Sequence, residues 1–80
     1  MTRAEHRAIR LVRLILLLDA HRPYGLSVQE IAEKMDIPYR QVFRDLDGVE
    51  RIGVPLITEE RGRYRILDTY PLPRIIERMR

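Results

Sequence analysis

Two helical segments joined by a short turn constrain the fold of this chain more than any other feature. The first opens with a capping box, in which the hydroxyl of Ser27 can accept from the amide of Glu30 and the carboxylate of Glu30 can reach back to the amide of Ser27. The second opens at Pro38, a residue favoured at the first helical position, and runs to about Ile52 before Gly53 stops it. Two helices with so short a connection have the spacing of a helix-turn-helix.

A longer helix is predicted ahead of this pair, over Ala4–Ala20, where apolar residues recur at helical spacing. The stretch His-Arg-Pro-Tyr-Gly at 21–25 ends it, because Pro and Gly interrupt helices. Leu14 and Leu17 give the helix apolar side chains on more than one side. A deeply buried helix would explain this, and so would a second contact surface for a partner subunit or a further domain.

Two strands are predicted after the helices, over Val54–Ile57 and Arg63–Leu67. Residues 58–62 connect them, and Gly62 suits a turn position with positive φ. A two-stranded hairpin is marginal by itself, so we expect it to dock on the helices as a wing. Alternation places Tyr64 on the opposite side of the hairpin from the arginines that flank it.

Together these segments predict an α+β fold, a winged helix-turn-helix made of a three-helix bundle with a two-stranded β-hairpin wing. This domain is expected to span residues 1–67. Residues 68–80 are expected to be a Pro-containing linker and the start of a connecting helix, carrying Ile75, Ile76 and Met79, toward a C-terminal domain outside the chain. A complete, stand-alone small regulator is the alternative.

The charge balance is only weakly basic, with 15 Lys and Arg against 12 Asp and Glu among 80 residues. Lys34 is the sole lysine, so the other fourteen basic residues are arginine. Arginine has a planar donor fork that suits phosphate and guanine, but a GC-rich genome would also favour arginine codons. Composition therefore leaves both explanations open, and position in the fold has to decide between them.

Several function classes have no support in the sequence. The chain has no Cys, and its two histidines, His6 and His21, are far apart, so neither a disulfide framework nor a metal site is predicted. No nucleophile motif or phosphate loop is present, so we expect no enzyme and no cofactor. The longest apolar run, Leu14–Leu18, is too short for a membrane span and resembles no signal peptide, which favours a cytoplasmic protein.

The helix over 38–52 is predicted to read DNA. On a helical wheel its apolar side carries Val42, Leu46 and Val49, while Arg40 and Arg44 lie on the opposite arc. The major groove admits an α-helix, and the first residues of a recognition helix reach base edges. Arginine can bind guanine O6 and N7, and glutamine can bind adenine N6 and N7. The helix as a whole is neutral, so only its first two turns have the chemistry to read bases.

Other residues extend this predicted interface. Tyr39 is expected to reach a phosphate or a thymine methyl group or to remain structural, Phe43 to pack under the wing and mainly in the core, and Asp45 to orient an arginine. The free amides at the helix that Ser27 caps could bind phosphate. Arg61 and Arg63 could give the wing, over 58–65, contacts to phosphate or a minor groove. The candidate contacts to double-stranded DNA are Ser27, Tyr39, Arg40, Gln41, Arg44, Arg61 and Arg63, with Arg3 and Arg7 as further phosphate contacts.

A known family shares these motifs. Leu-Ser-Val-Gln-Glu-Ile-Ala-Glu-Lys-Met from 26, Ile-Pro-Tyr-Arg-Gln-Val-Phe-Arg-Asp-Leu from 37, and the Gly-Arg-Tyr hairpin from 62 resemble the N-terminal domain of DeoR-type and WYL-domain transcriptional regulators. The resemblance covers roughly residues 5–73 and implies a winged helix that binds promoter DNA through Tyr39, Arg40, Gln41, Arg44, Arg61 and Arg63. Pro38 and Gln41 depart from it, since the family often has a small hydroxyl residue and Thr at these positions.

Two further expectations follow. A homodimer would let such a regulator read two half-sites. A competing function is protein interaction or dimerisation through the Leu14 and Leu17 side of the first helix and the segment around Ile75, Ile76 and Met79. The sequence specifies neither an operator, nor the direction of regulation, nor the effector of a C-terminal domain.

Overall fold

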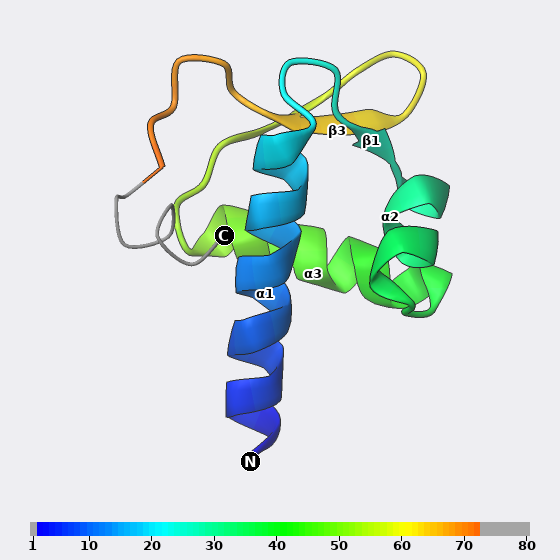
Figure 1. The fold of residues 1–80 in the computed structure, drawn as a ribbon, viewed down its shortest axis with the longest axis vertical. Coiled ribbons are helices and arrows are strands. Elements are labelled where there is room, and N and C mark those ends of the chain that lie inside the picture. The colour runs from blue at the N-terminus through cyan, green and yellow to red at the C-terminus, as the bar shows by residue number, and fades with distance from the viewer. Residues whose placement is uncertain (1, 73–80) are drawn as a thin grey trace.

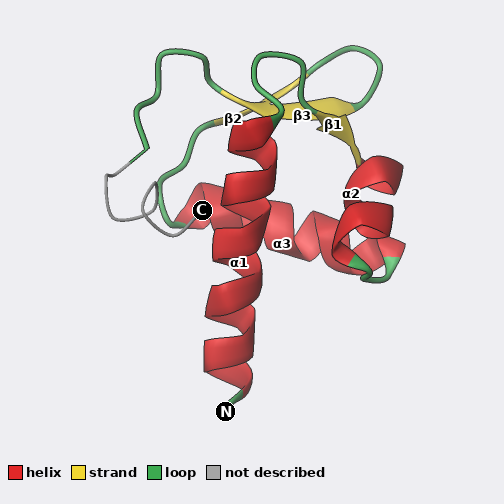
Figure 2. Ribbon diagram, viewed as in Figure 1, coloured by secondary structure: helices red, strands yellow, loops and turns green. Residues whose placement is uncertain are grey.

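The computed structural model describes residues 2–72 and contains three helices and three short strands (Figures 1 and 2). They are α1 (Arg3–Ala20), β1 (Leu26–Ser27), α2 (Val28–Met35), α3 (Tyr39–Arg51), β2 (Leu56–Thr58) and β3 (Arg63–Ile66). In Figure 1, α1 crosses in front of α3, α2 lies to one side, and the sheet lies near the C-terminal end of α1. The predicted α+β class is confirmed, and the arrangement is that of a winged helix-turn-helix.

Local hydrogen bonds fix the starts of the first two helices. The hydroxyl of Thr2 caps α1 by accepting from the amide of Glu5 at 3.1 Å. The capping box of α2 is confirmed, because the amide of Glu30 donates to Ser27 Oγ at 3.1 Å and the amide of Ser27 donates to Glu30 Oε1 at 3.0 Å. These bonds satisfy amides that have no partner inside the helix.

The expected position of Pro38 was wrong by one residue. Pro38 is the N-cap of α3, with φ −60° and ψ 146°, and the helix itself begins at Tyr39. The proline ring fixes φ but leaves ψ free to be extended, and its missing N–H needs no partner at either position. At the other end, Gly53 has the positive φ of 104° that was expected of a stop residue.

The sheet has three antiparallel strands in the order β1-β3-β2, one more than the predicted hairpin. β1 pairs Leu26 with Tyr64, and its two residues are too few to show an alternating pattern. The first hairpin strand was also predicted too early, at Val54. Pro55 has no N–H to give to a ladder, so regular pairing starts after it, with Leu56 opposite Ile66.

The core lies where the three helices and the sheet meet. Leu14 on α1 is fully buried, so it offers no free contact surface, and Leu17 is half-buried against the core. The helix as a whole is not deeply buried, because residues 3–9 are exposed and only Leu11, Leu14, Ile15 and Leu18 are buried. The other buried hydrophobic residues are Leu11, Ile15, Leu18, Leu26, Val28, Ile31, Met35, Val42, Leu46, Val49, Val54, Ile66 and Leu72. Gly48 of α3 lets α1 approach closely, because a Cβ there would lie 3.2 Å from both methyl groups of Leu11.

Residues 68–72, on the linker side of the predicted boundary, lie against this domain. Leu72 is buried, Tyr70 packs against the core, and the carbonyl of Tyr70 accepts from Arg22 Nη1 at 2.7 Å. The boundary after residue 67 stays a prediction. The connecting helix expected from residue 74, with Ile75, Ile76 and Met79, lies outside the described residues.

Gly25, in the loop before β1, gives a test of how closely that loop approaches β3. It has a φ of +76°, and an added Cβ would lie 2.3 Å from the carbonyl oxygen of Tyr64. Gly62 has a similar φ of +77° but open space around it. We expect Gly62→Ala to cost about 1–2 kcal/mol of stability through backbone strain alone, and Gly25→Ala to cost at least about 2 kcal/mol more through the added collision. Urea denaturation measures both, and equal losses would contradict the close approach.

Candidate nucleic-acid interface

Helix α3 presents two exposed ridges on the side away from the core. Val42, Leu46 and Val49 are buried, as expected from the helical wheel. Tyr39 and Phe43 form what we call the aromatic ridge, and Arg40 and Arg44 form the arginine ridge. All four side chains are exposed, and Arg40 and Arg44 have no ion pair or hydrogen bond within residues 2–72.

A buried ion pair fixes α3 against α1. Asp45 is completely buried, and its two carboxylate oxygens accept from Arg10 of α1, from Nε at 2.5 Å and from Nη2 at 3.1 Å. The expectation that Asp45 orients an arginine is confirmed. This burial could have been predicted, because Asp45 lies three residues after Val42 and four before Val49, on the apolar side of the helix. A charge placed there needs a partner.

Gln41 also binds this carboxylate. Its Nε2 donates to Asp45 Oδ1 at 2.9 Å, and the side chain is half-buried. A side-chain amide has two N–H groups and a carbonyl oxygen, so this bond uses one N–H and leaves the other N–H and the carbonyl oxygen available. Gln41, a predicted DNA contact, therefore also helps to satisfy the buried carboxylate of Asp45.

The arginine ridge continues toward the N-terminal part of α1. A hollow of about 310 Å³ is lined by Arg7 and Arg10 of α1 and by Gln41, Arg44, Asp47 and Arg51 of α3. Arg7 lies over Gly48, with its Nη2 3.2 Å from where a Cβ would be. The exposed acid here, Asp47, pairs with Arg51 at 2.9 Å. The fold thus brings Arg7, a predicted phosphate contact, beside Arg44.

The two predicted wing arginines have different surroundings. Arg61 is exposed in the turn between β2 and β3, next to Gly62, whose φ of +77° agrees with the expected turn. Arg63 instead binds the body of the domain: Nη1 donates to Glu30 Oε1 at 3.0 Å and Nη2 donates to the carbonyl of Gly25 at 2.7 Å. The structure therefore gives Arg63 a tertiary role that the sequence did not reveal.

The start of α2 carries a carboxylate as well as free amides. The hydrogen bond from the amide of Ser27, together with the Ser27 hydroxyl and the nearby charge of Arg63, lowers the pKa of Glu30 below its ordinary value of 4.5. Glu30 is therefore ionised at neutral pH, at the helix end where an incoming phosphate would meet it. Arg63 offsets that negative charge.

Phe43 does not pack in the core, contrary to expectation. It is 45% exposed and Tyr39 is 57% exposed, and the two rings meet edge to face with centroids 5.5 Å apart. The reason is geometric, because Val42 and Leu46 already fill the side of α3 that faces the bundle. Phe43 instead borders a hollow shared with the start of α2 and the wing.

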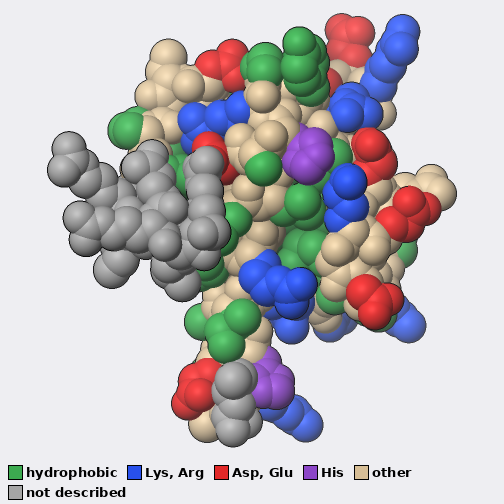
Figure 3. Space-filling model, in the orientation of Figure 1, with side chains coloured by type: hydrophobic (Ala, Val, Ile, Leu, Met, Phe, Trp, Pro, Cys, Tyr) green, Lys and Arg blue, Asp and Glu red, His purple; other side chains and the backbone are tan. Residues whose placement is uncertain are grey.

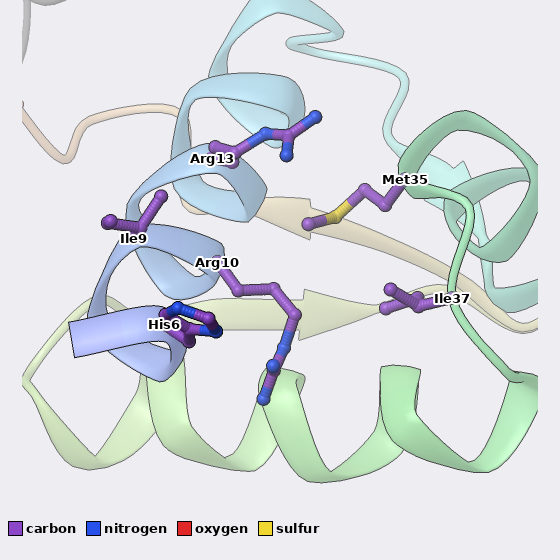
Figure 4. A pocket seen from close by; sticks show the side chains of 6 residues that line it. All are labelled: His6, Ile9, Arg10, Arg13, Met35 and Ile37. Carbon is purple, nitrogen blue, oxygen red and sulfur yellow. The ribbon is translucent and has the colours of Figure 1, made fainter. Parts of the chain in front are cut away.

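Other hollows lie between α1 and α2. One of about 360 Å³ is lined by His6, Ile9, Arg10, Arg13, Met35 and Ile37, and Figure 4 shows Arg10 extending from α1 past it toward α3. A second of about 390 Å³ includes Leu16 and Leu17. Figure 3 shows hydrophobic side chains on this face, with basic and acidic groups interspersed around them. Leu17, which was expected in a competing protein-interaction surface, lines one of these hollows. Leu14, expected in the same surface, is buried in the core and cannot contribute to it.

The described part of the chain offers no arrangement for metal binding. Within residues 2–72 no three His, Asp or Glu side chains gather in a group that could hold an ion. None of the helices in that range combines the length and the apolar composition needed to cross a bilayer.

Comparison with known proteins gives one informative match. The chain is 30% identical over 67 residues to the "Uncharacterized HTH-type transcriptional regulator YobV" of Bacillus subtilis (strain 168). The match covers 81% of this chain and 21% of that protein, so the chain spans about a fifth of the length of the relative. No family model and no solved structure matches the chain.

The buried ion pair gives a stability prediction. Asp45→Ala leaves Arg10 without its carboxylate and should lower the free energy of unfolding by about 3 kcal/mol, measured by urea denaturation. Asp47→Ala is the matched control, because it removes an exposed ion pair from the same helix and should cost less than about 1 kcal/mol. Similar losses for the two variants would contradict a structural role for Asp45.

The capping box gives a pH prediction. Because the pKa of Glu30 is lower in the folded state, its stabilising contribution is present above the ordinary value of 4.5 and is lost as the pH falls through the folded value. The stability advantage of the wild type over Glu30→Gln should therefore shrink on acidification below 4.5. Denaturation over a pH series measures this, with Glu33→Gln, one turn later on α2 and outside the box, as the control. An advantage that does not vary with pH would contradict a lowered pKa of Glu30 in the folded state.

Proposed function

We propose that this chain is the DNA-binding domain of a bacterial transcriptional regulator and binds duplex DNA sequence-specifically. The observation that carries the proposal is the arginine ridge: Arg40 and Arg44 stand exposed and unpaired within residues 2–72, on the first turns of a helix whose other side is buried. The name of the Bacillus subtilis relative, an HTH-type transcriptional regulator, supports the same function.

In this proposal α3, over 38–52 with its caps, enters the major groove. Arg40 and Arg44 bind guanine O6 and N7 through their planar donor forks. Gln41 contributes its remaining N–H and its carbonyl oxygen, and the bond to Asp45 holds its amide in one orientation. Tyr39, on the first turn of the helix, completes the set of contacts from α3.

Phosphate contacts come from the surrounding elements. Arg61 reaches the backbone from the wing over 58–65, and Arg7 reaches it from α1. The amides after Ser27 face a phosphate at the start of α2. Arg63 acts at the same place by neutralising Glu30 and by holding the wing to α2, so its contribution to affinity is partly indirect.

The type of regulator and its domain boundaries are also part of the proposal. The domain is of the DeoR or WYL-regulator type, with residues 1–67 as the DNA-binding unit and residues 68–80 leading toward a C-terminal domain. The relative is about five times longer than the matched segment, which supports further domains in the full-length regulator. A homodimer that reads two half-sites follows from this type of regulator. Sedimentation with and without duplex DNA distinguishes this function from protein interaction through the α1–α2 face.

The proposal is tested by selecting duplexes from a random pool on the 80-residue chain and measuring variants on the recovered sequence. Arg40→Ala and Arg44→Ala should each weaken specific binding by about 1–3 kcal/mol, because each removes a base contact. Arg13→Ala is the matched control, since it removes the same charge from an exposed arginine on the side of α1 that faces α2. Equal losses for all three would contradict direct base reading by the arginine ridge.

The salt dependence of binding is measured in the same titrations. Affinity for the recovered duplex should fall steeply as salt rises, because phosphate contacts release counterions. Arg61→Ala should lower the slope of log affinity against log salt by about one. A slope that is flat in the wild type would contradict the phosphate contacts.

A further inference from the structure

The aromatic ridge is unusual for the exposed side of a short, charge-rich helix. Phe43 has no polar atom, yet nearly half of its side chain is open to solvent, and Tyr39 one turn earlier is more exposed still. The two rings meet at 71° with their centroids 5.5 Å apart. This edge-to-face contact holds the ring of Phe43 beside the arginine ridge.

The aromatic ridge faces a hollow where three elements converge. Its volume is about 300 Å³, and it is lined by Val28 at the start of α2, by Tyr39 and Phe43 of α3, and by Arg61 and Tyr64 of the wing. An apolar ring therefore lies between two proposed DNA contacts, the arginine ridge on one side and Arg61 on the other. In the proposed docking this hollow faces the duplex.

The chemistry of the major groove limits what such a ring can meet. The base edges present hydrogen-bond donors and acceptors, and the distinctive apolar group among them is the C5 methyl of thymine. Phe43 lies next to Arg44 in the sequence, on the second turn of α3, so the two side chains leave the helix at the same level along its axis, about 100° apart around it. A ring without polar atoms gains by burying a methyl group and loses by covering a donor or acceptor.

We propose that Phe43, held edge to face by Tyr39, contacts a thymine methyl group and makes a thymine part of the recognised sequence. This inference rests on the proposed DNA-binding function. It adds a specific base to the site, read by apolar contact beside the arginine contacts to guanine.

The test deletes the methyl group from the DNA. The probe is the duplex recovered from the random pool, remade with each thymine replaced singly by deoxyuridine, which lacks only that methyl. We expect the wild type to bind one or two of these duplexes about three- to tenfold more weakly than the parent. Phe43→Ala should bind those duplexes and the parent equally. Ile52→Ala, which removes an exposed side chain at the other end of α3, should keep the wild-type difference.

The outcomes separate this inference from the function on which it rests. A parent duplex that binds tightly, with no deoxyuridine effect at any position, would overturn the thymine contact alone and leave Phe43 against a sugar or the wing. A deoxyuridine effect that persists in Phe43→Ala would also overturn it. Recovery of no duplex at all would overturn the proposed function and this inference together. The deoxyuridine series uses the wild-type chain, so it does not depend on the stability of a variant.

Discussion

The contact between Arg10 and Asp45 determines how the rest of the structure is arranged. A completely buried carboxylate is costly unless it is paired, and Asp45 is bound by both Arg10 and Gln41. The pair joins residues 35 positions apart and fixes the rotation of α3 against α1. That rotation sets which side chains of α3 face outward. The exposure of Arg44 and Phe43 is therefore a consequence of where Asp45 is buried.

A second network does the same for the wing. Arg63 binds Glu30 and the carbonyl of Gly25, so it joins β3 to the start of α2 and to the loop before β1. Among residues 2–72, two kinds of arginine can thus be distinguished. Arg10 and Arg63 hold elements together, while Arg40, Arg44 and Arg61 have no bonded partner within residues 2–72. A small core gains stability from the first group, and the proposed interface consists largely of the second.

Much of the fold and part of the interface could be predicted. The capping box at Ser27, the stop at Gly53 and the burial of Val42 were all correct, because each depends on a few neighbouring residues. The two-residue strand β1 was missed, since its pairing with Tyr64 depends on a segment far along the chain. Phe43 was expected in the core because apolar residues usually are, but the positions around it had already filled that side.

The sequence by itself determined the helix and turn boundaries, to within a residue or two, and the two sides of α3. These properties come from caps, backbone preferences and the helical repeat, which act over a few residues. Only the tertiary structure decided which arginines are bound and which remain exposed. A long side chain chooses its partner from the elements that fold beside it, and Arg63 meets Gly25 across 38 positions of sequence. Composition alone could not distinguish bound from exposed arginines, because both contribute equally to the net charge of +3.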